Sequence, residues 1–118
     1  MLKVVRTWDA KNVAGEFIEC NGLLYSSTFR LTASIQVWNK WGNMISNIQL
    51  DGWMGQLVSY NGTVYCSCQN DMLKINESGE LEHVMHLDGF VALLTAWGED
   101  LVSRTRNNDK MTTFCVWK

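Results

Sequence analysis

The sequence has little of several features that commonly identify a function. No run of apolar residues approaches the ~18 residues of a membrane span. The formal net charge is −2 and the pI is about 5.6, so the chain lacks the basic excess that usually accompanies nucleic-acid binding. No targeting peptide is evident, because Met1 leads directly into a charged, strand-like pattern. These features favour a cytoplasmic protein that binds neither a membrane nor nucleic acid.

Residues for a catalytic or metal centre are also scarce. The two histidines, His83 and His86, are expected on one strand, and no pair of ligand clusters has the spacing of a zinc site. Neither histidine has an evident carboxylate partner, no nucleophile is paired with a base, and no glycine-rich loop would hold a phosphate. We therefore expect no metal, no cofactor and no catalytic residues. An enzyme would need carboxylates that converge on a channel, and this is the weaker hypothesis.

The four cysteines form no recognisable disulfide framework. Cys66 and Cys68 are two positions apart on one expected strand, where the geometry is poor for a disulfide bond. Cys20 and Cys115 lie elsewhere in the strand pattern. We predict that all four are buried free thiols.

An internal repeat is the most informative feature that is present. The tetrapeptide Leu-Asp-Gly-Trp at 50–53 recurs as Leu-Asp-Gly-Phe at 87–90. Residues 15–27 match residues 55–67, and residues 93–103 stand at the same place in a third copy. Asn-Gly lies between the two apolar runs of the first and second copies, as in hairpins whose type I′ turn needs positive φ at both central residues. A repeated unit that cannot bury its own apolar face must stack on its copies.

Each hairpin is followed by a second one, so a unit has four antiparallel strands. In the fourth strand of the first unit, Met44, Ile48 and Leu50 share one face at a period of two, as in a half-buried strand. No segment has an apolar stripe at helical spacing with caps. The expected strands are 15–20, 23–27, 35–38 and 44–50; 55–60, 63–67, 72–75 and 81–87; and 93–97, 101–103 and 112–117.

The third copy ends at Lys118 before a fourth strand, and residues 2–9 supply a candidate at the other terminus, with Asp9 in the place of Asp51 and Asp88. The chain is therefore expected to be a single all-β domain, 1–118. Its three circularly permuted repeats cover roughly 13–51, 52–88, and 89–118 plus 1–12.

Four-stranded antiparallel repeats of ~40 residues resemble the blades of β-propellers. The resemblance is generic, to quinoprotein-, NHL- and kelch-like blades, and the paired motifs of WD40 blades are absent. Known propellers have about four or more blades, so it implies that two chains close a six-bladed ring as a homodimer. Each N-terminal strand would then complete the partner's blade and remove an open edge. Fucose-binding lectins are similar in closing six blades from short chains. The alternative is a small open sandwich or barrel.

In propellers the connections between blades and the loops between second and third strands lie on one face, which is the usual ligand face. Here the loops at 28–33, 68–71 and 104–110 differ most between copies, and variable loops on a repeated scaffold commonly carry function. The candidate ligand-binding residues are Arg30, Asp51, Trp53, Asp88, Phe90, Arg104, Arg106 and Lys110.

Each candidate has a structural alternative. Asp51 and Asp88 precede glycine, where aspartate stabilises turns. Trp53 and Phe90 belong either to the core or to the mouth of a pocket, and the cations to solvated loop tips. Two hypotheses remain for the ligand: a protein or other macromolecule held by aromatic and arginine anchors, or a small ligand such as a glycan, an anionic metabolite or a nucleotide.

The other large apolar residues of interest separate into two groups. Trp38, Ile75 and Trp117 occupy equivalent positions in the third strands, which predicts packing between blades. Trp41 and Trp97 lie at turns on the opposite face, where an exposed tryptophan would favour contact with a partner.

Overall fold

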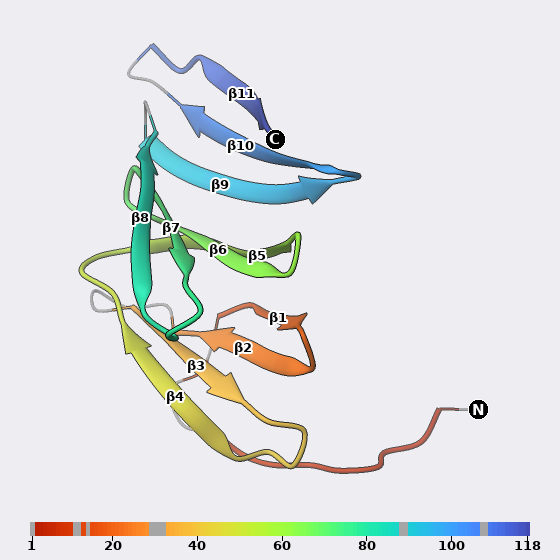
Figure 1. The fold of residues 1–118 in the computed structure, drawn as a ribbon. Helices are drawn as coiled ribbons and strands as arrows, with labels where there is room; N and C mark the ends of the chain where they lie inside the picture. Colours follow the sequence, from red (N-terminus) through yellow and green to blue (C-terminus); the bar gives the residue numbers. More distant parts are fainter. Residues whose placement is uncertain (1, 11–12, 14, 29–32, 88–89, 107–108) are drawn as a thin grey trace.

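The computed structural model describes residues 2–10, 13, 15–28, 33–87, 90–106 and 109–118. Within these ranges the chain is all-β, with three antiparallel sheets of four, four and three strands (Figure 1). The all-β prediction is therefore confirmed. The described ranges contain no helix that is long and apolar enough to cross a membrane.

Each sequence repeat folds into one sheet whose strands follow one another in chain order. The first sheet contains β1 (Phe17–Cys20), β2 (Leu23–Ser27), β3 (Ser34–Trp38) and β4 (Met44–Gln49). The second contains β5 (Met54–Tyr60), β6 (Thr63–Cys68), β7 (Asp71–Ile75) and β8 (Leu81–His86). The third contains β9 (Phe90–Trp97), β10 (Asp100–Arg106) and β11 (Thr112–Trp117).

The turns and the pairing register confirm the repeat. Asn21 and Gly22 have φ of 52° and 82°, and Asn61 and Gly62 have 54° and 77°, as a type I′ turn requires. The same register recurs in all three sheets. The equivalent pairs are Tyr25 with Val37, Tyr65 with Lys74, and Val102 with Val116.

Two apolar clusters hold the sheets together. The first lies between the first and second sheets and includes Ile35, Leu50 and Leu57. The second lies between the second and third sheets and includes Leu87 and Leu94. Leu50 and Leu87, the leucines of the repeated tetrapeptide, are therefore buried at equivalent places in the two junctions. Full burial of each such side chain stabilises the fold by roughly 1.5–3 kcal/mol.

The sheets follow one another in a row with their first strands adjacent. β1 contacts β5, and β5 contacts β9, while Figure 1 shows the first and third sheets at opposite ends of the row. The connections β4–β5 and β6–β7 emerge at one end of the sheets, which we call the loop face. The tight turns β1–β2, β5–β6 and β9–β10 emerge at the opposite end, which we call the turn face.

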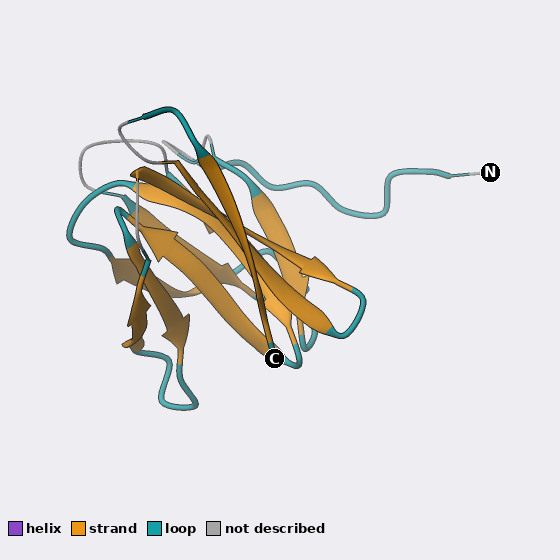
Figure 2. Ribbon diagram, turned by 90° about the horizontal axis from the view of Figure 1, so that it is seen from above, coloured by secondary structure: helices purple, strands orange, loops and turns teal. Residues whose placement is uncertain are grey.

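The expected strand at 2–9 is not formed within the single chain. Residues 2–10 have no regular secondary structure, and Figure 2 shows this segment leading away from the sheets. Arg6 Nη1 donates to the Lys40 carbonyl at 2.7 Å, and the Trp8 ring lies 6.1 Å from that of Trp38. The segment thus lies beside the first sheet, whereas the open edge of β11 is at the far end of the row. Residues 2–10 pair with no described strand, although β4 is also an edge strand of the first sheet.

Two other expectations are wrong. Met44 does not share the buried side of Ile48 and Leu50, because a β-bulge opposite Val37 and Trp38 shifts the register and leaves Met44 exposed. The segment 104–110 is not wholly a loop. β10 continues to Arg106, which pairs with Thr112 of β11.

Candidate functional site

The loop face of the second sheet is built by two turns that contact each other. Gln69 N–H donates to the Trp53 carbonyl at 2.8 Å, which joins the β6–β7 turn to the β4–β5 connection. Gly52 has φ of 133°, and a Cβ atom there would lie 2.4 Å from Gln69 Nε2. The positive φ favours glycine at this position, and any side chain there would also have to displace the end of the Gln69 side chain. The turn interpretation of the Asp-Gly motif is supported at Asp51.

Trp53 projects from this joint. Its side chain is 58 % exposed, so the core alternative for Trp53 is wrong. Asp51, in the same connection, is also exposed. A large aromatic side chain held in water beside a carboxylate, on backbone that two turns fix, is suited to contact with a partner.

Asp71, His83 and His86 form a polar cluster at the start of β7 and on β8. Asp71 Oδ1 lies 2.9 Å from His86 Nδ1 and 3.3 Å from His83 Nε2. Residues three apart on a regular strand face opposite sides, but a β-bulge between the Met72 and Leu73 pairings places both imidazoles beside one carboxylate. The hydrogen bonds from His86 and then from His83 lower the pKa of Asp71.

The expectation that the histidines have no carboxylate partner is therefore wrong. Asp71 pairs directly with His86 across the β7–β8 ladder. The spacing of three between the histidines contained no signal, because the bulge that brings them together is not visible in the sequence. Metal binding gains no support from this cluster: within the described ranges, no group of three or more ligand residues is placed to hold a metal ion.

The cysteines are free thiols, and three of them are buried. Burial raises the pKa of the Cys66 thiol to about 12, and Cys68 adds to this effect. Burial, followed by the charges of Asp71 and Asp51, also raises the pKa of Cys68. A cysteine nucleophile needs a lowered pKa. Cys68 therefore lies near an Asp–His pair without the properties of an activated thiol. Cys115 is only partly buried, contrary to expectation.

The predicted cations lie apart from Asp51 and Trp53. Arg104 and Arg106 are exposed at alternate positions of β10, with Thr105 buried between them. Lys110 is exposed before β11 and has φ of 63°. Arg30 and Asp88 lie outside the described residues. Phe90 begins β9, and its side chain is outside the description.

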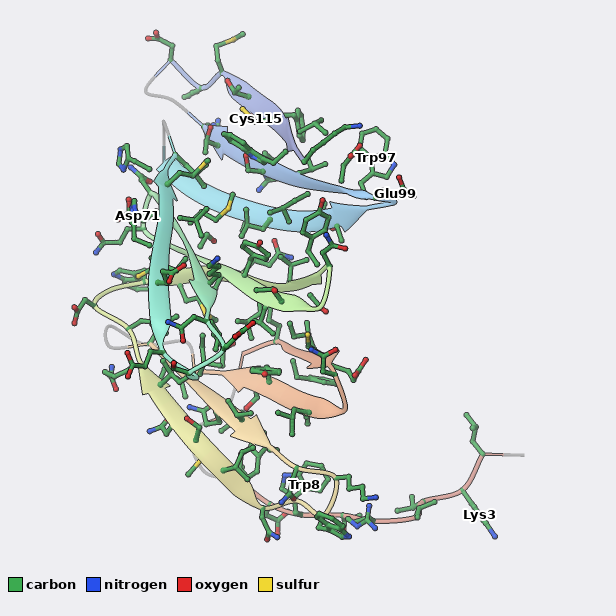
Figure 3. The ribbon with its side chains drawn as sticks, viewed as in Figure 1. Lys3, Trp8, Asp71, Trp97, Glu99 and Cys115 are labelled. Carbon is green, nitrogen blue, oxygen red and sulfur yellow. The ribbon has the colours of Figure 1, made fainter. Side chains whose placement is uncertain are left out.

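Trp117 packs against the apolar cluster between the second and third sheets, as predicted, whereas Trp38 is buried outside both clusters and has the Trp8 ring beside it. Trp38 Nε1 donates to Ser26 Oγ at 2.8 Å, and Trp117 Nε1 donates to Ser103 Oγ at 2.9 Å, the same hydrogen bond in two sheets. Trp41 and Trp97 are exposed at turns, as predicted. Figure 3 shows Asp71 on one side of the row, and Trp97 with Glu99 on the other.

No protein-family model, curated protein or solved structure matches this chain. Its function is therefore inferred from the residues described above.

Proposed function

We propose that this chain is a non-enzymatic binding module that recognises a protein or other macromolecule through the loop face. The single observation that carries the proposal is the exposure of Trp53 at a point where the hydrogen bond from Gln69 joins two turns. Tryptophans of this kind dominate interface energetics when a partner covers them. Asp51 and the Asp71–His83–His86 cluster supply polar groups at the same end of the second sheet.

We propose further that the sheets are propeller blades and that two chains close a six-bladed ring. The described part of the third sheet has three strands and an open edge at β11. The N-terminal segment has exposed apolar side chains at Leu2, Val4 and Val5 and pairs with no strand among the residues that the structure describes. Its pairing with the β11 edge of a second copy would complete that sheet.

Catalysis is not part of the proposal. The raised pKa values of Cys66 and Cys68 disfavour the thiolate form that a nucleophile requires. We place the assembly in the cytoplasm, because buried free thiols suit a reducing compartment.

A small anionic ligand is the second candidate. Arg104 and Arg106 project from β10 at alternate positions and are both exposed. Planar guanidinium groups suit phosphate and carboxylate groups.

A paired screen separates these candidates. A glycan array and a thermal-shift screen with nucleotides and sugar phosphates test the small ligands, and affinity capture followed by quantitative binding tests the macromolecular partner. We expect Trp53→Ala to weaken binding of an identified macromolecule at least tenfold and the Arg104→Ala, Arg106→Ala pair to weaken binding of an anion. Trp41→Ala is the matched control, since Trp41 is an exposed turn tryptophan of the first sheet. Loss of binding in the control alone would contradict a site on the loop face.

A further inference from the structure

The two junctions between sheets contain an equivalent hydrogen bond at their first strands. Glu16 Oε1 accepts from the Leu57 N–H at the first junction. Gln56 Oε1 accepts from the Leu94 N–H at the second, at 3.2 Å. Glu16 and Gln56 occupy equivalent repeat positions, as do Leu57 and Leu94. Each sheet thus reaches the same backbone group of the sheet that follows it.

A second equivalent hydrogen bond lies on the turn face. Asn21 Nδ2 donates to the Gly62 carbonyl at 2.9 Å, and Tyr60 Oη donates to the Glu99 carbonyl at 2.7 Å. Gly62 and Glu99 are both the second residue of the tight turn after a first strand. The donors stand at adjacent rather than equivalent repeat positions, since Tyr60 corresponds to Cys20 and Asn21 to Asn61, but the accepting carbonyls are at equivalent positions. The second sheet is therefore placed on the first, and the third on the second, through an equivalent pair of backbone groups.

Within the described part of the chain, no sheet follows the third sheet. We call the side of a sheet that is turned toward the next sheet its forward face, and the other side its rear face. Phe114, on the forward face of the third sheet, is 68 % exposed, whereas its equivalents Met72 and Ile35 are 2 % and 0 % exposed. Trp97 is exposed at the place of Tyr60, which is half-buried, and of Cys20, which is buried. The forward faces of the first and second sheets are thus covered by the next sheet, whereas that of the third sheet is exposed.

The first sheet shows the complementary exposure. Phe17, on its rear face, is 71 % exposed, while its equivalents Leu57 and Leu94 are 3 % and 1 % exposed. The forward face of the third sheet has a hollow where the residue equivalent to Phe17, Leu57 and Leu94 in a following sheet would lie. A cavity of about 230 Å³ there is lined in part by Val102, Phe114 and Arg104, so docking there would cover one of the two arginines of the anion-binding alternative. Leu57 and Leu94 show how a residue at position 17 of a following sheet would be buried.

We propose that the forward face of the third sheet docks on the rear face of the first sheet of a second copy, which reproduces the two internal junctions. The inference rests on the proposed ring assembly and names its interface. Phe17 of the second copy would occupy the cavity beside Phe114. Trp97 Nε1 would donate to the carbonyl of Gly22 of the second copy, as Tyr60 donates to Glu99. The occupant is a second copy because both surfaces are parts of one repeated junction.

The first test measures the assembly state. We expect sedimentation of the wild-type chain to show twice the 13.5 kDa mass of the monomer. Phe17→Asp and Phe114→Asp should each weaken association at least tenfold and leave the circular dichroism spectrum and the thermal unfolding of the monomer unchanged, because both side chains are exposed in the single chain. Trp41→Asp is the matched control and should remain dimeric.

Mixing the two variants distinguishes this interface from a symmetrical one. A mixture of Phe17→Asp and Phe114→Asp chains retains one intact junction, so heterodimer should form where each variant alone is monomeric. An interface of the third sheet with itself would give no heterodimer, and this result would overturn the proposal.

Deletion of residues 1–7 separates the interface from the strand exchange. If the deletion abolishes the dimer but both phenylalanine variants remain dimeric, the face-to-face interface is wrong and the exchanged strand alone carries assembly. If the wild-type chain is monomeric at every concentration tested, both are wrong. Binding at Trp53 is measured separately, so neither result decides the loop-face function.

Discussion

The second and third sheets have the same origin in the repeat but different surroundings. The second is packed on both faces, with Leu57 and Cys66 in one cluster and Met72 in the other. The third buries Leu94 and Leu101 on its rear face and leaves Phe114 and Val116 exposed on its forward face. The difference teaches that the repeat keeps a large apolar residue at position 114 although it is exposed, whereas an exposed Arg104 replaces the buried Ser67 on the same face. The exposed Phe114 marks the face that the proposed second copy would cover.

The largest expected effect comes from truncating the same position in the two sheets. Met72→Ala should lower the free energy of unfolding by about 2–5 kcal/mol, because it leaves a cavity in a packed junction. Phe114→Ala, at the equivalent place, should change the free energy of unfolding of the monomer by less than about 0.5 kcal/mol. Denaturant unfolding of monomeric preparations measures both. Similar losses in the two variants would show that the forward face of the third sheet is already packed.

The serine–tryptophan hydrogen bond allows a smaller comparison between the first and third sheets. Ser26→Ala removes the acceptor of the buried Trp38 Nε1 group and should cost about 1–3 kcal/mol. Ser103→Ala should cost less, because Trp117 is only half-buried and water can replace the hydroxyl. Thermal unfolding of the two variants, with Cys66→Ala as the equivalent change in the second sheet, tests the order. A larger effect of Ser103→Ala would contradict it.

The first-strand hydrogen bonds predict a dependence on pH. Burial raises the pKa of Glu16, and the hydrogen bond from Leu57 opposes this shift without cancelling it. A carboxyl group whose pKa is raised by folding favours the folded state below its unfolded pKa, and this contribution is lost as pH rises through the folded pKa. Glu16→Gln should therefore raise the melting temperature near pH 7 by a few degrees, and the difference should disappear near pH 4.

Gln56→Glu at the second junction is the matched control, since it introduces the same carboxyl group. It should lower the melting temperature near pH 7 and have little effect near pH 4. A stabilising effect of this control near neutral pH would mean that the ionised carboxylate is the better acceptor at these junctions.

The smallest expected effect is the order in which the thiols react, which is measured without any substitution. Native alkylation should modify Cys115 first, because it is partly exposed, and Cys66 last, because it is buried and its thiol pKa is raised to about 12. Mass spectrometry over time gives the order. Denaturing alkylation without reduction should modify all four cysteines. Early modification of Cys66 would show that the junction between the first and second sheets opens readily.

The local sequence pattern of apolar residues and turn residues predicted most of the fold. Alternating apolar residues and the Asn-Gly turns located the strands within a few residues, and β2 and β11 have the predicted bounds. Position 44 was misassigned because a bulge changes which side a residue faces without leaving a mark in composition. Residues 2–9 have a strand-like sequence, but a strand needs an edge to pair with, and that edge is not a property of the segment itself.

The candidate site was predicted less well than the fold. Repetition pointed to Asp51 and Trp53, and the structure places both on the loop face. Repetition could not point to Asp71 with His83 and His86, because the other repeats have different residue types at these positions. The three side chains meet only through the β8 bulge. The arginines of β10 were assigned to a loop because the pairing of Arg106 with Thr112 depends on the register of β11.

The accepting carbonyls of Gly62 and Glu99 belong to the main chain. A main-chain acceptor persists whatever residue occupies the position, so Asn21 and Tyr60 can serve as donors of different length and chemistry. Repeats joined in this way tolerate sequence drift at their junctions after duplication. The main chain keeps the placement of one sheet on the next, while the side chains can change and form different surfaces.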